Sequence, residues 1–277
     1  MAQMRAAVVG HVEWITFARV ARVPAPGEIV HAAAWWEEPG GGGAVAAVQL
    51  AKLAEEVRFI TALGDDDIGR RAHAELEALG VRLDTVFRPV EQRRAFTFVD
   101  DAGERTITVL GERLAPRAID PLPWEAFANI DAAYVCAPDP AIIRLARRAR
   151  VLVATARILD AVVASGVELD ALVGSRLDPS ERYEEVRLDP EPRLMVRTEG
   201  ARGGTFRTAG GSWQRFEPQP VAGSIVDTYG AGDSFAAGLT FALARGDAAP
   251  EAIAFAARCG AAVLTGAGPY RGQIDRP

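Results

Sequence analysis

The residues best suited to chemistry lie in one short segment, where small residues precede an acidic residue at the start of an expected helix. Gly230, Ala231 and Gly232 lead into Asp233, and a helical apolar pattern covers 232–244. The first turn of a helix leaves N–H groups without partners, and the helix dipole adds partial positive charge there. Glycines also let a ligand approach the backbone closely. The segment therefore predicts a binding site for an anion such as phosphate.

A carboxylate beside a phosphate site has a definite chemical use. Asp233 can accept the proton of a hydroxyl group while the neighbouring amides hold a phosphoryl group in transfer, as this reaction requires. The alternative interpretation is that Asp233 only caps the helix and the glycines only form a turn. So short a pattern does not choose between the two, and the rest of the chain has to decide.

Short buried strands alternate with helices over most of the chain and would position this segment. Arg5–Val9 is the first such strand, and Ala44–Ala54 is an alanine-rich helix expected to pack on both sides. This alternation implies an α/β fold with a mostly parallel sheet covered on both faces, a three-layer α/β/α sandwich. Further strands are expected at 57–63, 132–136, 151–155, 171–174, 193–197, 204–208 and 212–216, and further helices at 68–79, 141–150, 161–166 and 249–264.

Two regions interrupt the alternation with hairpin signals. Strands are expected at 15–20 and 28–36, on either side of a turn rich in proline. Strands at 94–100 and 105–110 flank a turn that contains Gly103, which is typical of a β-hairpin. We expect these strands to pair into a small separate β-sheet that acts as a lid. The segments of this lid are about 15–37 and 93–111, inserted in a single domain of residues 1–277.

Composition and charge argue against several classes of function. The chain has 277 residues, 49% of them hydrophobic, which allows a large core without disulfides or metals. The net charge of −6 argues against nucleic acid as the main partner, because a duplex-binding surface is normally basic. No stretch is apolar over the roughly 18 residues that a membrane span requires. No signal-peptide pattern follows the N-terminus, so we expect a cytoplasmic protein.

The cysteines and histidines show no pattern of a disulfide or metal site. Cys136 and Cys259 lie far apart and outside any C-x-x-C pair, so we expect two buried, reduced thiols. His11, His31 and His73 are scattered and lack the spacing of zinc ligands. No zinc site is therefore predicted.

The segment Asp227–Asp233 resembles a known family signature. It is similar to the D-T-x-G-A-G-D motif of the ribokinase-like (PfkB) carbohydrate and nucleoside kinases, with Tyr229 in the free position. This motif is far more specific than a pair of glycines, and the resemblance covers nearly the whole chain. Other stretches similar to family motifs are Gly40–Ala44 for G-G-x-G, Gly64–Gly69 for G-x-D-x-x-G, Thr198–Gly204 for T-x-G-x-x-G, and Gly266–Pro269 for the loop on the adenine side.

The resemblance implies an ATP-dependent phosphotransferase and assigns roles to these residues. Asp233 would be the catalytic base, and the amides of Gly230, Ala231 and Gly232 would form the anion hole. Asp227 would lie near a site for a monovalent cation such as K⁺. The family fold is a central α/β sandwich with a β-sheet lid, whose closure would exclude water and suppress ATP hydrolysis. ATP would bind against Thr198, Gly200, Gly203, Gly230, Gly232 and Gly268, and the acceptor against Gly41, Gly42, Gly43 and Asp233.

Three positions depart from the family at the acceptor site. Ile15 stands where an aspartate of the family usually binds sugar hydroxyls. Glu13 would accept hydrogen bonds from those hydroxyls instead, or it would be a solvated charge at the end of a strand. Val45 stands in the place of an asparagine and cannot form a hydrogen bond through its side chain. Gly42 stands in the place of a lysine. The acceptor pocket is therefore expected to be less polar than a ribose site.

The metal motif and the lid carry further expectations. The family's N-x-x-E motif, which orders Mg²⁺ through water, is reduced here to a stretch ending at Asp178. Asp178 would contact the waters around the metal, or the stretch is an unrelated loop. Arg94 and Thr97 lie in the expected lid and would contact the acceptor. Trp35 and Trp36 would stack on a substrate ring, or pack between lid strands or in a dimer interface. An exposed apolar lid face would favour a homodimer.

The predicted function is transfer of the γ-phosphoryl group of Mg-ATP to a hydroxymethyl group of a sugar or sugar-like small molecule. One alternative is a nucleoside kinase of the same fold, because Ile15 and Val45 leave a less polar pocket. Another is a non-catalytic ligand-binding homologue, because the acceptor residues and the metal motif are altered. A Rossmann dehydrogenase is disfavoured, since Gly40–Gly43 follow a lid strand and no acidic residue comes at the expected spacing.

Overall fold

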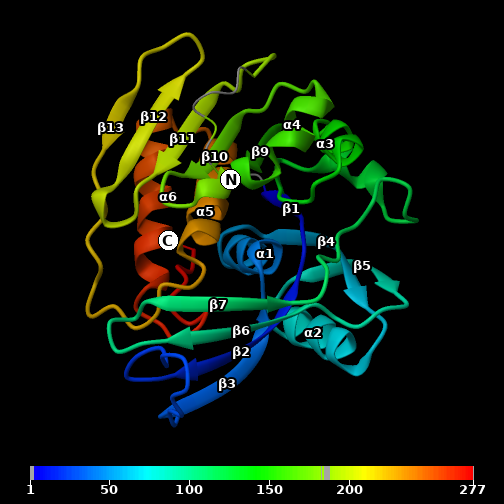
Figure 1. The fold of residues 1–277 in the computed structure, drawn as a ribbon. Helices are drawn as coiled ribbons and strands as arrows, with labels where there is room; N and C mark the ends of the chain where they lie inside the picture. Colours follow the sequence, from blue (N-terminus) through cyan, green and yellow to red (C-terminus); the bar gives the residue numbers. More distant parts are fainter. Residues whose placement is uncertain (1–2, 182, 184–187, 277) are drawn as a thin grey trace.

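The computed structural model describes residues 3–181, 183 and 188–276, whose strands form a larger and a smaller sheet (Figure 1). The larger sheet consists of β1 (Arg5–Val9), β4 (Glu56–Gly64), β5 (Arg82–Arg88), β8 (Ala132–Val135), β9 (Val151–Thr155), β10 (Ala171–Ser175), β11 (Leu194–Thr198), β12 (Gly204–Thr208) and β13 (Gln214–Phe216). The smaller sheet consists of β2 (Glu13–Arg19), β3 (Ala34–Gly40), β6 (Arg94–Val99) and β7 (Arg105–Leu110). The helices are α1 (Gly42–Leu53), α2 (Asp67–Ala78), α3 (Pro140–Ala146), α4 (Leu159–Ser165), α5 (Ala231–Arg245) and α6 (Ala249–Val263).

The larger sheet is mostly parallel, as the alternation of strands and helices predicted. Its strand order is β13-β12-β11-β10-β9-β8-β1-β4-β5, and only β12 and β13 pair antiparallel, at one edge. Because the other strands run in one direction, their carboxyl ends meet at the same edge of the sheet. In open α/β sheets this edge is where ligands bind.

Two buried clusters lie on opposite faces of the larger sheet. Ala6 and Val8 of β1 belong to one cluster, whereas Ala7 and Val9 belong to the other, as the two-residue period of a strand requires. Helices α1, α2, α5 and α6 contribute to the first cluster, and α3 and α4 contribute to the second (Figure 1). The predicted class, a three-layer α/β/α sandwich with an additional small sheet, is confirmed.

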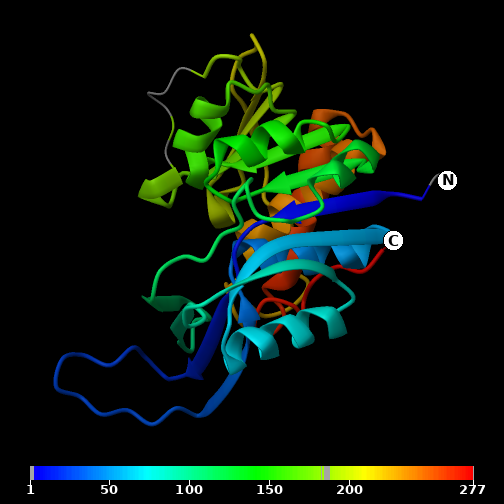
Figure 2. The ribbon, with the colours of Figure 1, turned by 90° about the vertical axis from the view of Figure 1, so that its right-hand side faces the viewer.

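The smaller sheet joins the two predicted hairpin regions, in the order β3-β2-β6-β7. β2 pairs antiparallel with β3 and parallel with β6, and β6 pairs antiparallel with β7. The loop between β2 and β3 projects away from the rest of the protein (Figure 2). The smaller sheet follows directly on β1 and leads into α1, so it lies beside the carboxyl ends of the parallel strands.

Two strands differ from the sequence prediction. The strand predicted at 28–36 begins only at Ala34 and continues to Gly40. Glu28 accepts hydrogen bonds from Arg22 and from the amide of Ala25, which close a turn where an extended chain was expected. β5 was not predicted, because this edge strand has an exposed arginine at its start and half-buried side chains along the rest of its length.

The cysteines lie in the core as free thiols, as expected. Cys136 follows β8 and Cys259 lies within α6, and both are buried. In the part of the chain that the structure describes, no helix has the length and apolar character needed to cross a bilayer.

The contact between α5 and α6 leaves no room for a side chain at Gly238. A Cβ at this position would lie 2.7 Å from Sγ of Cys259 and 3.1 Å from Cα of Ala256. We expect Gly238→Ala to lower the free energy of unfolding by roughly 1–3 kcal/mol, as overpacking does, measured by urea denaturation. Because Cys259→Ala removes the clashing sulfur, the double variant should lose less than the sum of the two single losses. Additive losses would contradict this close packing.

Candidate active site

The N-terminus of α5 forms one side of the candidate site. Gly230 precedes the helix with φ 83°, a left-handed conformation that favours glycine. The amides of the first helical turn, Ala231 to Asp233, have no acceptors four residues earlier within the helix. A Cβ at Gly232 would meet nothing within 4 Å, and Gly232 is exposed. The backbone of this turn is therefore open to an approaching anion.

A buried carboxylate shapes the loop that precedes α5. Asp227 is fully buried, and its two oxygens accept hydrogen bonds from the amides of Tyr229 at 2.8 Å and Gly268 at 2.9 Å. The hydroxyl of Tyr229 in turn accepts a hydrogen bond of 3.0 Å from the amide of Gly41. Asp227 and Tyr229 thus join the α5 loop, the Gly268 loop and the glycine loop before α1.

The glycine loop before α1 brings the helix start against Asp233. A Cβ at Gly42 would lie only 2.9 Å from Oδ1 of Asp233. A Cβ at Gly43 would lie 2.8 Å from main-chain atoms of Gly10 and His11, at the end of β1. These short distances explain why glycines occupy both positions. Gly42 and Gly43, which were predicted to contact the acceptor, therefore lie at the carboxyl end of β1, and Gly42 lies next to Asp233.

Glu13 and His11 form a buried polar pair near these glycines. Glu13 accepts a hydrogen bond of 2.8 Å from Nε of Arg93, and Nε2 of His11 lies 3.8 Å from the same carboxylate. Burial, followed by the positive charges of Arg113 and Arg93, lowers the pKa of His11 to about 3. The imidazole is therefore neutral, and its buried Nδ1 has no partner among the described residues.

A group of charges follows β9 and β10 at the same edge of the sheet. Arg157, just after β9, forms ion pairs with Asp178 at 2.8 Å and with Glu181. Asp178 also accepts hydrogen bonds from the amide and hydroxyl of Ser180. The predicted metal-side residue Asp178 is thus held by an arginine in this structure.

Asp233 is half-buried, and its environment makes it a weaker acid than usual. Burial raises the pKa of its carboxyl group to about 6, because the charged form loses hydration. The positive charge of Arg157 opposes this rise, whereas the negative charges of Glu181 and Glu13 add to it. A carboxyl group with a pKa near 6 is ionised at neutral pH and remains basic enough to accept a proton.

The residues predicted to contact ATP lie at the end of β11, in the turn after it and in the loop that contains Gly268. Thr198 ends β11, and the following turn contains Gly200 with φ 59° and Gly203 with φ 75°. A Cβ at Gly203 would lie 2.2 Å from the main-chain oxygen of Phe216, so this turn packs against β13. In the order of the sheet, β10, β9 and β8 separate this turn from β1.

The lid residues predicted to contact the acceptor lie on opposite faces of β6. Thr97 is fully buried, and its hydroxyl has no partner among the residues that the structure describes. Arg94 is exposed, three residues away on the other face. Arg93, which precedes the strand, is the arginine that contacts Glu13. The structure therefore brings Arg93 to the candidate site and leaves Arg94 at the surface.

The neighbouring tryptophans differ in their surroundings. Trp36 stacks on Phe17 with ring centroids 4.9 Å apart and donates a hydrogen bond of 2.6 Å to Glu38. Phe17 also meets Tyr229 edge to face at 5.4 Å. Trp36 thus packs between strands of the smaller sheet, which was one of the expectations. Trp35 is 70% exposed.

Two arginines of the smaller sheet bind the segment that leads into α5. Arg19 on β2 donates a hydrogen bond of 2.6 Å to the main-chain oxygen of Val226. Arg105 on β7 donates to the main-chain oxygen of Thr228. The smaller sheet and the α5 loop are therefore in direct contact.

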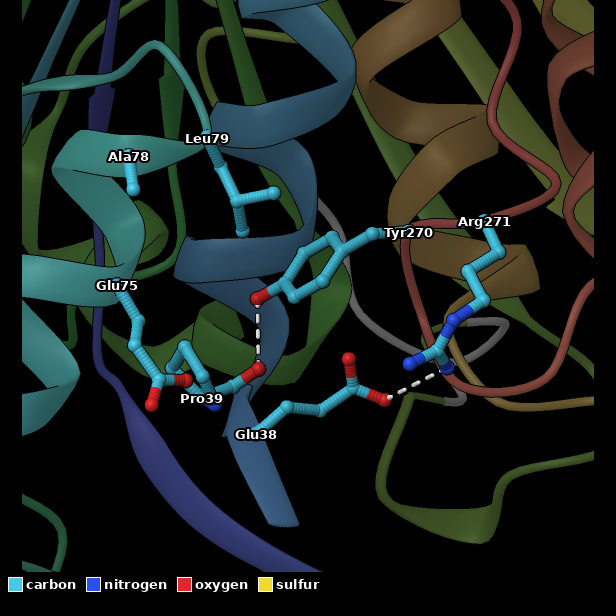
Figure 3. A pocket seen from close by; sticks show the side chains of 7 residues that line it. All are labelled: Glu38, Pro39, Glu75, Ala78, Leu79, Tyr270 and Arg271. Atoms are coloured by element: carbon cyan, nitrogen blue, oxygen red, sulfur yellow. Dashed lines mark hydrogen bonds and ion pairs between the residues drawn. The ribbon is translucent and has the colours of Figure 1, made fainter. Parts of the chain in front are cut away.

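A separate pocket of about 300 Å³ lies between the end of β3, α2 and the C-terminal segment (Figure 3). The hydroxyl of Tyr270 donates a hydrogen bond of 2.7 Å to the main-chain oxygen of Pro39, and Arg271 lies 3.7 Å from Glu38. None of the predicted site residues lines this pocket, so it does not belong to the candidate site.

Several residues at this edge of the sheet were not predicted from the sequence. Arg157 directly follows a predicted buried strand, and the rule that ligands bind at the carboxyl ends of parallel strands could have found it. Arg93 was missed by one residue, because the hairpin pattern does not fix which of two adjacent arginines turns inward. His11 was considered only as a metal ligand, and Arg113 carries no local signal.

Comparison with known proteins identifies the class that this fold and site define. The sequence model described as pfkB family carbohydrate kinase matches residues 3–160 and 143–275. The chain therefore belongs to the pfkB family of carbohydrate kinases, and it is an ATP-dependent carbohydrate kinase, as the resemblance of Asp227–Asp233 implied.

Individual relatives cover almost the whole chain. An ATP-dependent ribose-1-phosphate kinase of Halopiger xanaduensis is 30% identical, over 93% of this chain and 91% of the relative. A fructokinase of Klebsiella pneumoniae is 28% identical, over 83% of this chain and 88% of its own length. The crystal structure of a ribokinase from Thermotoga maritima has a TM-score of 0.75 at 22% identity, covering 99% and 97% of the two chains, and shows the same fold.

Because the pKa of Asp233 is raised in the folded state, ionisation of this carboxyl group lowers the free energy of unfolding. Between the ordinary value of 3.8 and about 6, the folded state holds this proton more tightly than the unfolded state, so stability falls as pH rises. We expect Asp233→Asn to raise the free energy of unfolding at pH 8 by roughly 1–2 kcal/mol, with the gain disappearing below about pH 4. Urea denaturation at both pH values measures this difference.

The control for this measurement is Asp101→Asn, which changes an exposed carboxylate in the turn between β6 and β7. It should alter stability little at either pH. An Asp233→Asn variant that is less stable than the wild type at pH 8 would contradict the environment described for this carboxylate.

Proposed function

We propose that this kinase transfers the γ-phosphoryl group of ATP to a hydroxymethyl group of a sugar or sugar-like molecule, with Asp233 as the catalytic base. One observation carries the proposal. A half-buried carboxylate lies in the first turn of α5, next to unpaired amides, and the space over Gly232 is open. This arrangement supports proton acceptance and phosphoryl binding at adjacent places.

The proposed reaction uses both parts of this turn. The acceptor hydroxyl gives its proton to the ionised carboxylate of Asp233 while its oxygen forms a bond to the γ-phosphorus. The bond between that phosphorus and the oxygen bridging to the β-phosphate breaks, and its electron pair leaves with ADP. The amides of Gly230, Ala231 and Gly232 would stabilise the charge on the phosphoryl oxygens. ATP would bind beside Thr198, Gly200, Gly203 and Gly268.

Cations are part of the same proposal. The buried carboxylate of Asp227 has no ion-pair partner among the described residues, and burial raises its pKa, so a monovalent cation such as K⁺ beside it would balance its charge. Mg²⁺ would be bound mainly by ATP phosphates and water, as is usual for this ion. Asp178 would contact its waters. When bound, Mg²⁺ would neutralise part of the negative charge on the phosphates of ATP.

The smaller sheet is proposed to act as a lid over the acceptor, with Glu13 and Thr97 on its inner side and Arg94 at its margin. A lid that excludes water favours transfer to the acceptor over hydrolysis. A homodimer through the outer face of this sheet is also proposed. Trp35 is 70% exposed there and Leu110 is 53% exposed, and exposed apolar side chains are typical of interfaces.

The names of the relatives favour a sugar as the acceptor but do not fix its charge. The Halopiger relative is named for ribose 1-phosphate, a phosphorylated sugar, and the Klebsiella relative for fructose, a neutral one. A nucleoside acceptor stays an alternative, because Ile15 and Val45 are fully buried and offer no polar group. A panel of sugars, sugar phosphates and nucleosides in an ADP-release assay separates these substrates.

Replacing the proposed base should remove transfer and leave nucleotide binding intact. We expect Asp233→Asn to lower kcat by roughly 10²–10⁴-fold, because the amide cannot accept the hydroxyl proton. The dissociation constant of ATP, measured by calorimetry, should change little, and Asp101→Asn should behave as the wild type. Full turnover in Asp233→Asn would remove this residue from its role.

The pH dependence of kcat/KM should report the ionisation of Asp233. Activity should fall about tenfold per pH unit below a midpoint near pH 6, because only the ionised carboxylate accepts a proton. Arg157→Gln should move this midpoint to higher pH, and Glu181→Gln should move it to lower pH, since their charges act on Asp233 with opposite signs. Free substrates titrate identically for every variant, so a midpoint that stays fixed in both would contradict the assignment.

A further inference from the structure

Arg113 is a half-buried cation without a partner. It lies in the loop after β7, and it forms no hydrogen bond or ion pair with any residue that the structure describes. A guanidinium group that is partly removed from water normally has a carboxylate beside it, because the charge otherwise loses hydration without compensation. An arginine without such a partner has its guanidinium donors free to bind an anionic group such as phosphate.

The position of Arg113 places it at the candidate active site. Two residues before it, a Cβ at Gly111 would lie 3.9 Å from Cα of Arg93, so this loop lies beside the arginine that contacts Glu13. The charge of Arg113 accordingly acts on His11, on Cys136 just after β8, and on Glu13. Arg93, whose side chain contacts Glu13, and Arg157 also lie close enough to repel it. Burial and, next, the charge of Arg93 lower the pKa of Arg113. Three arginines from separate segments thus converge at the carboxyl ends of β1, β8 and β9.

Three carboxylates of this region, apart from Asp233, are already paired with the other two arginines. Arg93 contacts Glu13, and Arg157 binds Asp178 and Glu181. His11 adds no charge, because its imidazole is neutral. Arg113 therefore remains without a direct ion-pair partner among the described residues.

Among the described residues, the acceptor side of the site offers few side chains that could bind hydroxyl groups. Ile15 and Val45 are fully buried apolar side chains, and Gly42 has no side chain. Binding energy for the acceptor therefore has to come from the groups present, and an unpaired guanidinium binds phosphate through charge-assisted, often bidentate hydrogen bonds.

We infer that Arg113, assisted by Arg93, binds a phosphate group on the acceptor, so that the substrate class is a sugar phosphate with a free hydroxymethyl group. This inference rests on the proposed function, since Asp233 still has to receive the proton of that hydroxymethyl group. ATP is proposed to bind elsewhere, with its γ-phosphoryl group at the α5 amides and the rest of the nucleotide at the turn after Thr198. In the order of the sheet, β10, β9 and β8 separate that turn from β1.

The test compares a sugar phosphate with the same sugar lacking the phosphate, using ribose 1-phosphate and ribose. Arg113→Ala and Arg113→Met remove the charge, and Arg113→Lys restores a cation without the guanidinium fork. Arg117→Ala is the matched control, since Arg117 lies in the same loop and is exposed. Unfolding measurements on each variant check the fold, and loss of an unpaired, half-buried cation should not lower stability.

The expected result is a selective defect toward the phosphorylated acceptor. Arg113→Ala and Arg113→Met should raise KM for the sugar phosphate by roughly 10–100-fold, with kcat/KM for the neutral sugar and KM for ATP unchanged. Arg113→Lys should recover part of the loss. A wild type that prefers neutral ribose, equal defects with both acceptors, or a defect in KM for ATP instead would overturn the inference while leaving Asp233 as the base.

A binding measurement keeps the two proposals distinguishable. Calorimetry of Asp233→Asn with ribose 1-phosphate, without ATP, should show binding that is lost when Arg113→Ala is added. If no acceptor is phosphorylated by the wild type, the proposed function fails, and this titration alone then decides the role of Arg113. Absence of binding, or binding that survives removal of Arg113, would overturn the inference.

Discussion

The candidate site depends on one buried charge, the carboxylate of Asp227. Its two oxygens accept amide hydrogens from Tyr229 and Gly268, and Tyr229 then reaches Gly41 through its hydroxyl. Segments more than 180 residues apart in sequence, the loops before α1 and before α5, are fixed against each other by this short series of hydrogen bonds. Buried hydrogen bonds to a charged group are strong, and an amide deprived of such an acceptor is costly. The geometry at Asp233 therefore follows from Asp227.

The parallel sheet supplies the rest of the site through its direction. Because β1, β8, β9, β10 and β11 all end at one edge, residues that follow these strands gather without being neighbours in sequence. This edge collects both signs of charge. Glu13 pairs with Arg93, and Asp178 and Glu181 pair with Arg157. The half-buried Asp233 has no such partner among the described residues, and burial raises its pKa. A carboxylate that ionises near pH 6 and a surplus guanidinium are thus products of the same arrangement.

The sequence predicts those features that local patterns determine. Continuous apolar runs predict the buried parallel strands, and the glycines before Asp233 predict an open helix N-terminus. β5 escaped prediction because an edge strand with half-buried side chains has no apolar run. The approach of Gly42 to Asp233 and the inward turn of Arg93 depend on packing between distant segments, and no local pattern records them. The place of Asp233 at an open helix N-terminus could therefore be predicted from the sequence, but the arginines around it could not.

The contacts of Arg19 and Arg105 with the main chain before α5 have a consequence for the order of events in a catalytic cycle. These guanidinium groups hold the carbonyls of Val226 and Thr228, which flank Asp227. If the smaller sheet opens as the proposed lid, both contacts would break and the backbone that leads into α5 would be released. Under that proposal, access for the acceptor is coupled to release of this backbone. A nucleotide that binds while the sheet is open would then meet an incompletely ordered phosphate site, which would limit hydrolysis of ATP until the acceptor is enclosed.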